Sequence, residues 1–300
     1  MIIDAHVHLW DRQNGMVNHR PVTALTGGKS DFGGEIRQMM PPYMLDGRNT
    51  VEMLMANMDY AQVSGCVVTQ EIIDGNQDAY LLDCKKRYGN RMKICCLYEE
   101  QPMEDQRADQ WGDPWVSQFD GIKICGGRLS DGDLLHHAQV FEQADRLGKF
   151  ISIDLAEGTL QTDAMQQLAD RFPRLKMAVG HFGMVTVPGW EKQIELAKKP
   201  NVFIETGGIT WLFHQEYYPY PSAVKAIRTA IEICGIDKLM WGSDYPRTMT
   251  AITYLMSRDF IEKSEELTLE EKTKLLGENA KDFYGFEKLD VPPRIRNMVE

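Results

Sequence analysis

Short apolar runs alternate with longer amphipathic segments along most of the chain. The runs are rich in Val, Ile, Phe and Met, which is typical of strands buried in a parallel sheet. We expect eight such strands, at Ile2–His8, Val63–Gln70, Met92–Leu97, Gly121–Cys125, Phe150–Asp154, Met177–His181, Val202–Thr206 and Leu239–Asp244. Parallel strands in this number, each followed by a helix, predict the α/β fold known as the (β/α)8 or TIM barrel.

The amphipathic segments between these runs predict helices, because apolar residues recur in them at helical spacing. The expected helices are Thr50–Gln62, Asn76–Tyr88, Asp133–Leu147, Gln161–Phe172, Pro188–Lys198, Ser222–Cys234 and Leu269–Tyr284. Gly148 and Gly235 stand where a glycine would end two of these helices. The pattern is therefore one of repeated βα units.

One segment, Trp10–Asn49, does not follow this alternation. It contains paired glycines and a Pro-Pro step, and it predicts a long loop after the first strand. In a barrel this loop lies over the active face, where it can act as a lid or read the substrate, although a disordered insertion would have the same composition. We assign residues 1–286 to a single domain, with 10–49 as its first βα loop and 287–300 as a C-terminal surface extension.

The composition is that of a soluble globular protein, with 43% hydrophobic and 26% charged residues. Lys and Arg number 33 against 44 Asp and Glu, and the net charge of −11 argues against general binding of nucleic acid or anionic membranes. The six cysteines show no C-x-x-C spacing, so we expect reduced thiols. The amino terminus does not resemble a signal peptide and no long apolar window occurs, so a cytoplasmic location is expected.

The motif His6-Val7-His8 ends the first expected strand. Side chains two residues apart on a strand point to the same face, so both imidazoles would face the barrel mouth and could share a cation. The alternative is a pair of histidines on a half-buried strand that meets carboxylates. The motif is therefore a candidate metal site.

Two further polar residues, Asp244 and His181, end apolar strands. Asp244 lies between Gly242 and Pro246, and a buried carboxylate needs a partner, which could be a metal, a positioned water or the start of a following helix. His181 alone is more typical of a hydrogen-bonded core histidine than of a ligand or base. Because barrel active sites are assembled from the carboxyl ends of strands, we expect both residues at the same mouth as the N-terminal histidines.

Five blocks of sequence carry a family resemblance: DAHVHLW, FDGIKI, LADRFPRLKMAVGHFG, KLMWGSDYPR and LLGENAKDFYGF. With these blocks, in this order between residues 4 and 286, the chain resembles the amidohydrolase superfamily, specifically the amidohydrolase-2 group of TIM-barrel hydrolases. That group includes pyrone-dicarboxylate lactonases, sugar lactonases such as fuconolactonase, and aromatic-acid decarboxylases.

The resemblance implies a metal site. His6, His8 and Asp244 fall on the family's ligands of the first and eighth strands, and His181 falls on its sixth-strand histidine. The fifth strand departs from the family, because Asp154 stands where metal-dependent members usually have a histidine. The first-strand histidines, with Asp154 and Asp244, could still hold one divalent metal, Zn²⁺ or Mn²⁺. Operation without a metal is the alternative.

Contacts with substrate are expected at other strand ends. Lys123 ends the fourth strand, where relatives with two metals carry a carboxylated lysine. Here we expect a cation that pairs with a substrate carboxylate, helped by Arg128 and Arg247, and the alternative is a lysine covered by loop carboxylates. Glu205 and Gln70, at the ends of the seventh and second strands, are expected to contact substrate hydroxyls.

The expected activity is hydrolysis of a lactone or similar cyclic ester of an anionic, carboxylated or sugar-acid substrate. Asp244 would act as general base toward water, and His181 would stabilise the oxyanion. The second hypothesis is a metal-dependent decarboxylase of an aromatic or muconate-type acid, and the third is a barrel that binds a ligand without catalysis. The aromatic string Trp211–Pro221 could contact substrate or a second copy of the chain in a homo-oligomer.

Overall fold

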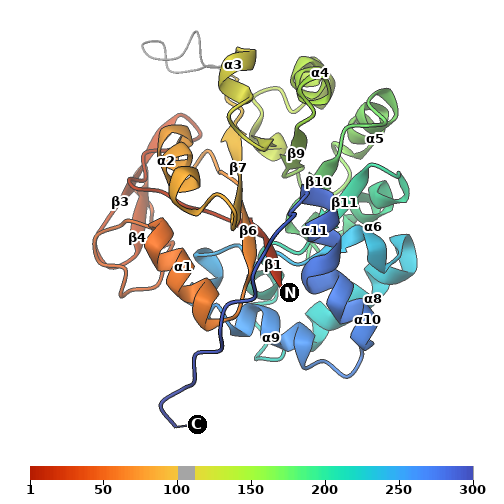
Figure 1. Ribbon diagram of the computed structural model, residues 1–300. Coiled ribbons are helices and arrows are strands. Elements are labelled where there is room, and N and C mark those ends of the chain that lie inside the picture. Colours follow the sequence, from red (N-terminus) through yellow and green to blue (C-terminus); the bar gives the residue numbers. More distant parts are fainter. Residues whose placement is uncertain (101–111, 300) are drawn as a thin grey trace.

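Eight parallel strands form a barrel (Figure 1). The computed structural model describes residues 1–100 and 112–299. The strands, in their order around the sheet, are β1 (Ile3–Val7), β6 (Gly65–Val68), β7 (Met92–Leu97), β8 (Gly121–Ile124), β9 (Phe150–Ile153), β10 (Met177–Val179), β11 (Val202–Glu205) and β12 (Leu239–Met240). Between the first and last strands, the Ala5 amide donates to the Trp241 carbonyl at 2.8 Å and the Asp244 amide donates to the His6 carbonyl at 2.9 Å. The predicted (β/α)8 barrel is confirmed.

Helices surround the barrel (Figure 1). They are α1 (Val51–Tyr60), α2 (Asp78–Tyr88), α3 (Asp113–Val116), α4 (Ala138–Leu147), α5 (Thr162–Arg171), α6 (Trp190–Glu195), α7 (Ile209–Leu212), α8 (Pro221–Cys234), α9 (Met256–Glu262), α10 (Leu269–Thr273) and α11 (Asn279–Tyr284). A π-helical turn, η7 (Lys274–Glu278), joins the last two, and a 3-10 turn, η2 (Leu134–His137), precedes α4. Gly148 and Gly235 end α4 and α8 with positive φ angles, as their positions in the sequence predict.

The long first βα loop contains a small sheet. It is antiparallel, with the strands β2 (Met16–Val17), β3 (Arg20–Ala24), β4 (Lys29–Phe32) and β5 (Ile36–Gln38) in that order. Val22 and Met39 pack with Ile73 of the loop after β6. Gly15 lies so close to that loop that a Cβ atom would stand 2.1 Å from the Ile72 carbonyl oxygen. The segment is therefore an ordered insertion that contacts a loop at the carboxyl end of the barrel.

Side chains fill the amino-terminal half of the barrel interior. Ile3, Phe150 and Met240 of the strands form a cluster with Phe283 and Tyr284 of α11. A larger apolar cluster lies between the strands and the surrounding helices. The helix α11 therefore packs against the amino-terminal end of the barrel. The polar side chains that project inward lie at the opposite end, at the carboxyl ends of the strands, where barrel active sites lie.

The remaining features of the fold are the cysteines and the C-terminal segment. All six cysteines are free and five of them are buried, as expected for reduced thiols. Residues 287–299 contain no helix or strand, and the Gln62 side chain donates to the Pro292 carbonyl at 3.2 Å. Within the described ranges, the helices are too short or too polar to cross a membrane.

Candidate active site

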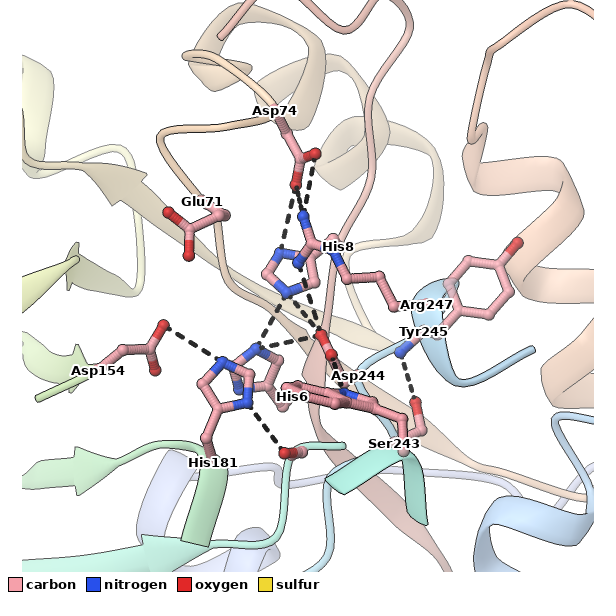
Figure 2. Close-up of polar contacts among 12 residues, drawn as sticks. His6, His8, Glu71, Asp74, Asp154, His181, Ser243, Asp244, Tyr245 and Arg247 are labelled. Atoms are coloured by element: carbon pink, nitrogen blue, oxygen red, sulfur yellow. Dashed lines mark hydrogen bonds and ion pairs between the residues drawn. The ribbon is translucent and has the colours of Figure 1, made fainter. Parts of the chain in front are cut away.

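Three histidines and an aspartate converge at the carboxyl ends of the strands (Figure 2). His6 and His8 lie at the end of β1 with their Nε2 atoms 3.0 Å apart. Asp244 follows β12, and its Oδ1 lies 2.9 Å from His8 Nε2 and 3.8 Å from His6 Nε2. His181 follows β10, and its ring centroid lies 4.8 Å from that of His6. The residues that the sequence singles out are therefore neighbours in space, and their chemical roles stay predictions.

Glu205, the last residue of β11, fixes the orientation of His6. Its Oε1 lies 2.6 Å from His6 Nδ1, and a carboxylate at this nitrogen favours the tautomer that carries its proton there. The unprotonated Nε2 then faces the mouth, where it can bind a cation. The other oxygen of Glu205 accepts from the Gly207 amide at 2.5 Å. Glu205 is thus a positioning residue for His6, and its direct contact with substrate stays a prediction.

The last strand is shorter than the sequence suggests. It ends at Met240 rather than at Asp244, because the chain turns at Gly242 to pass the buried Glu205. A Cβ atom at Gly242 would stand 2.7 Å from Glu205 Oε2 and 2.7 Å from His6 Cβ, so glycine is required for this approach. Asp244 itself has a φ of 58°, a conformation that costs on the order of 1–3 kcal/mol for a residue with a side chain. The turn places the Asp244 carboxylate beside β1.

The two oxygens of Asp244 have different contacts. Trp211 Nε1 donates to Oδ2 at 2.6 Å, whereas the buried Oδ1 faces His8 Nε2 at 2.9 Å and His6 Nε2 at 3.8 Å. Burial raises the pKa of this carboxyl, but the surrounding His8, Arg247 and His181 outweigh burial and hold the pKa well below its ordinary value. Asp244 is therefore ionised at neutral pH.

The donors at the mouth fit a divalent cation. His6, His8 and Asp244 each offer one ligand atom, and these atoms lie within 4.8 Å of one another. A second such group consists of His6, Asp154 and His181. Asp244 Oδ1 is a buried acceptor that faces the Nε2 atoms of His6 and His8, and imidazole nitrogens with carboxylate oxygens suit Zn²⁺ or Mn²⁺. Three of the four expected ligands, His6, His8 and Asp244, therefore form one group, whereas the fourth, Asp154, lies in a second group with His6 and His181.

Lys123, near the end of β8, faces Asp154, the residue that follows β9. The Lys123 side chain is fully buried, and its Nζ lies 2.6 Å from Asp154 Oδ2. The same carboxylate oxygen lies 3.6 Å from His181 Nε2. Burial lowers the pKa of His181, but Asp154 outweighs burial and raises the pKa to about 10. His181 is therefore cationic at neutral pH, and Lys123 has a carboxylate partner within the protein.

The two arginines expected to bind substrate also have acidic partners. Arg247 Nη2 donates to the two oxygens of Asp74 at 3.2 and 3.0 Å. Gln13, from the first βα loop, donates to Asp74 Oδ1 at 2.9 Å, so the insertion contributes to this network. Arg128 Nε donates to Glu71 Oε1 at 2.8 Å. These pairs compensate the charge of both arginines.

Asp4, Glu71 and Asp74 belong to the site but were not expected there. Asp4 Oδ1 accepts from the Ser243 amide at 2.8 Å and from the His6 amide at 3.1 Å, and thereby joins β1 to the turn before Asp244. Glu71 and Asp74 lie in the loop after β6 and meet the arginines. The one signal for these acids in the sequence is their position beside expected strand ends. That position does not show which residue each acid contacts.

Gln70 and the aromatic string contribute less directly than expected. The Gln70 amide donates to Asp78 Oδ1 and to the Cys95 carbonyl, both at 2.7 Å, so it anchors the loop after β6. Within the string, Trp211 reaches the site through its bond to Asp244, whereas Tyr217 is 93% exposed. A contact of the string with a second copy of the chain stays a prediction.

Comparison with known proteins places this barrel in a family. The model of the amidohydrolase family matches residues 3–286. The chain belongs to this family. A similar protein is L-fucono-1,5-lactonase from Burkholderia ambifaria, which is 26% identical over 257 residues, covering 81% of this chain and 80% of the lactonase.

Solved structures show the same fold. A probable 2-pyrone-4,6-dicarboxylic acid hydrolase from Pseudomonas putida has a TM-score of 0.67 at 17% identity, covering 96% of this chain and 98% of its own. An amidohydrolase from Burkholderia multivorans with bound zinc has a TM-score of 0.67 at 17% identity, covering 95% and 99%. The 5-carboxyvanillate decarboxylase from Novosphingobium aromaticivorans with manganese has a TM-score of 0.54 at 15% identity, covering 77% and 79%. Zinc and manganese thus occur in barrels of this fold.

Proposed function

We propose that this amidohydrolase opens a lactone by the attack of water at the mouth formed by its three converging histidines and Asp244. The observation that carries the proposal is the state of the two Asp244 oxygens. Trp211 holds Oδ2, and Oδ1 lies beside the first-strand histidines, 2.9 Å from His8 Nε2. A general base needs such a fixed orientation, with one oxygen directed at the mouth. The similarity to L-fucono-1,5-lactonase supports a lactone as the substrate class.

In the proposed reaction, Asp244 Oδ1 takes a proton from water while the water oxygen bonds to the lactone carbonyl carbon. His181, oriented by the bond between its Nδ1 and the Gly207 carbonyl at 2.9 Å, stabilises the negative charge on the carbonyl oxygen through Nε2. The bond between that carbon and the ring oxygen then breaks, and the leaving alkoxide takes the proton from Asp244. One lactone and one water give one hydroxy acid.

The same residues would hold a metal. His6, His8 and Asp244 would bind one divalent cation, Zn²⁺ or Mn²⁺, with Asp154 as a further oxygen donor in the overlapping group. When bound, such a cation polarises a carbonyl and lowers the pKa of water. Glu205 keeps His6 Nε2 directed toward the mouth. Metal binding is therefore part of the proposal.

We also propose that the substrate is an uncharged lactone of sugar type. Lys123 already contacts Asp154, and the two mouth arginines are paired with Asp74 and Glu71. A carboxylated substrate would have to displace one of these acids, whereas carboxylates accept hydrogen bonds readily from sugar hydroxyls. This preference differs from the anionic substrate expected from the sequence, and its basis is the pairing of the cations.

A substrate comparison tests the proposal. The purified protein, stripped of metal and then loaded with Zn²⁺ or Mn²⁺, is incubated with neutral aldonolactones and with pyrone-4,6-dicarboxylate, and the acid released is titrated. We expect turnover of neutral lactones, and a loss of about 10²–10⁴-fold in kcat for Asp244→Asn. The matched control Asp237→Asn, at a side chain that is 72% exposed on η5 (Ile236–Lys238), should retain wild-type activity.

Other outcomes would assign other functions. Faster turnover of the dicarboxylate would favour an anionic substrate. Release of CO₂ from a hydroxybenzoate, with no ring-opened acid, would establish a decarboxylase. If the folded wild-type protein consumes none of these compounds with either metal or without one, the barrel binds a ligand without catalysis and the proposed function is wrong.

A further inference from the structure

A further group of potential metal ligands lies outside the mouth residues. It consists of Glu100, Asp131 and His137, whose donor atoms lie within 4.8 Å of one another. Glu100 follows β7, and the other two residues belong to the connection between β8 and α4. The group shares no residue with the two groups around His6, so it needs an explanation of its own.

His137 is the buried member of this group. Its side chain is 10% exposed, and its Nδ1 lies 2.8 Å from the Tyr98 hydroxyl, a bond that orients the ring. The opposite nitrogen, Nε2, is buried and has no hydrogen-bond partner among the described residues. It faces Glu100 Oε1 and Asp131 Oδ1, each 3.5 Å away. A buried nitrogen of this kind points to a missing ligand.

These separations agree with the spacing of ligands around a metal. Two ligand atoms about 2.0–2.1 Å from a tetrahedral Zn²⁺ lie about 3.3–3.4 Å apart. A hydrogen bond between the imidazole and a carboxylate would be shorter, about 2.9 Å. The two carboxylates also repel each other across the nitrogen unless positive charge lies between them. The group therefore has the dimensions and the charge of a cation site.

Neighbouring groups already orient the two carboxylates. Ser130 donates to Glu100 through its amide at 2.8 Å and through its hydroxyl at 2.9 Å. The Asp133 amide donates to Asp131 Oδ1 at 3.0 Å, and His136 Nδ1 lies 2.7 Å from Asp131 Oδ2. Contacts of this kind hold ligands in place in metal sites. Binding of a cation would need little rearrangement.

We propose that Glu100, Asp131 and His137 form a zinc site separate from the proposed active site. One imidazole nitrogen with two carboxylate oxygens suits Zn²⁺ better than Ca²⁺ or Mg²⁺, which prefer oxygen ligands throughout. The Glu100 and Asp131 side chains are 25% and 43% exposed, so water can take the fourth position. The bound ion would tie Glu100, in the segment that follows β7, to the β8–α4 connection.

The zinc content of variants tests this proposal. The protein is stripped with a chelator, incubated with Zn²⁺ and desalted, and the metal is measured per chain by mass spectrometry. We expect Glu100→Gln and His137→Gln each to bind one zinc fewer per chain than the wild type. The control His19→Gln, at an exposed histidine between β2 and β3, should bind as much as the wild type. Equal zinc content in the wild type and both variants would overturn the proposal.

A second background separates this site from the mouth. In the double variant His6→Asn, Asp244→Asn, both mouth groups lose their shared ligand His6 and one also loses Asp244, so the zinc that remains bound reports on the proposed site. One zinc per chain that is lost on adding Glu100→Gln supports the proposal. If the double variant, folded by far-UV circular dichroism, binds no zinc, the proposal is wrong. Neither result depends on turnover of a lactone.

Discussion

At the scale of single residues, the mouth depends on buried charged groups that hold one another in place. Glu205 contacts His6 at 2.6 Å, and Lys123 contacts Asp154 at 2.6 Å. Removing one member of such a pair leaves the other without compensation in a region of low dielectric constant. Substituting Glu205 therefore tests whether it orients His6, and substituting Lys123 tests whether it balances the charge of Asp154.

The substitution Glu205→Gln tests the orientation of His6. The amide can donate toward His6 Nδ1 and so weakens the preference for the tautomer that leaves Nε2 unprotonated. We expect kcat/KM for a lactone to fall by about 10–100-fold and its pH profile to shift, because outer partners of site histidines have effects of this size. Steady-state kinetics across pH measures both. Glu195→Gln, at the end of α6 with a side chain that is 37% exposed, is the matched control, and an unchanged pH profile in Glu205→Gln would contradict the positioning role.

The substitution Lys123→Met tests charge balance. It leaves Asp154 buried without its cation, and we expect the free energy of unfolding to fall by about 3–5 kcal/mol. Urea denaturation followed by circular dichroism measures the loss. Adding Asp154→Asn should restore part of the stability, because it removes the uncompensated charge. A Lys123→Met protein of wild-type stability but raised KM would instead show that Lys123 binds substrate.

At the scale of elements, the sequence predicts the strands and helices that follow a repeating hydrophobic pattern. It misses the features that depend on contacts between residues far apart in the chain. The apolar runs place all eight barrel strands, because each run is buried on both faces. The strands of the insertion escape this pattern, since β5 is exposed throughout and β2 has two residues. The facing residues Lys123 and Asp154 come from neighbouring strands, and periodicity indicates which face a residue occupies without identifying its partner. The positive φ of Asp244 has no local signal of the kind that glycine provides.

The start of α10 offers a prediction at this scale that involves pH. Thr268 and Glu271 form a capping box, and Arg228 contacts the Glu271 carboxylate. Burial raises the pKa of Glu271, but the bonds from Thr268 and Arg228 outweigh burial and leave the pKa below its ordinary value of 4.5. The ionised form is therefore favoured by folding, and this stabilisation is present above pH 4.5 and lost as the pH falls through the folded pKa.

The variant Glu271→Gln should accordingly be less stable than the wild type by about 1 kcal/mol at pH 7. The difference should shrink as the pH is lowered toward 4. Urea denaturation of both proteins at several pH values measures it. Glu270→Gln, at the neighbouring position with a side chain that is 75% exposed, is the control. A difference that is constant with pH would show that the charge of Glu271 contributes nothing.

At the scale of the whole molecule, the site exists only when the first and last strands of the barrel pair with each other. His6 and Asp244 come from opposite ends of the sequence, and the bond from the Asp244 amide to the His6 carbonyl joins them at 2.9 Å. The packing of Phe283 and Tyr284 of α11 against Ile3 adds a second connection at the other end of the barrel. We therefore expect the barrel to open as one cooperative unit.

The reactivity of the thiols measures this cooperativity. Burial raises the pKa of the Cys66 and Cys95 thiols well above the ordinary range, and it raises the pKa of Cys234 to about 11. Because the thiolate is the reactive form, the native protein at pH 8 should react slowly with a disulfide reagent, whereas the denatured chain should titrate six thiols at once. With increasing urea, the reaction rate should rise in parallel with the loss of far-UV circular dichroism, since thiols on different strands become accessible in the same opening. A thiol that reacts rapidly before any loss of helical signal would show that one part of the barrel opens independently, and the peptide that carries it would locate that part.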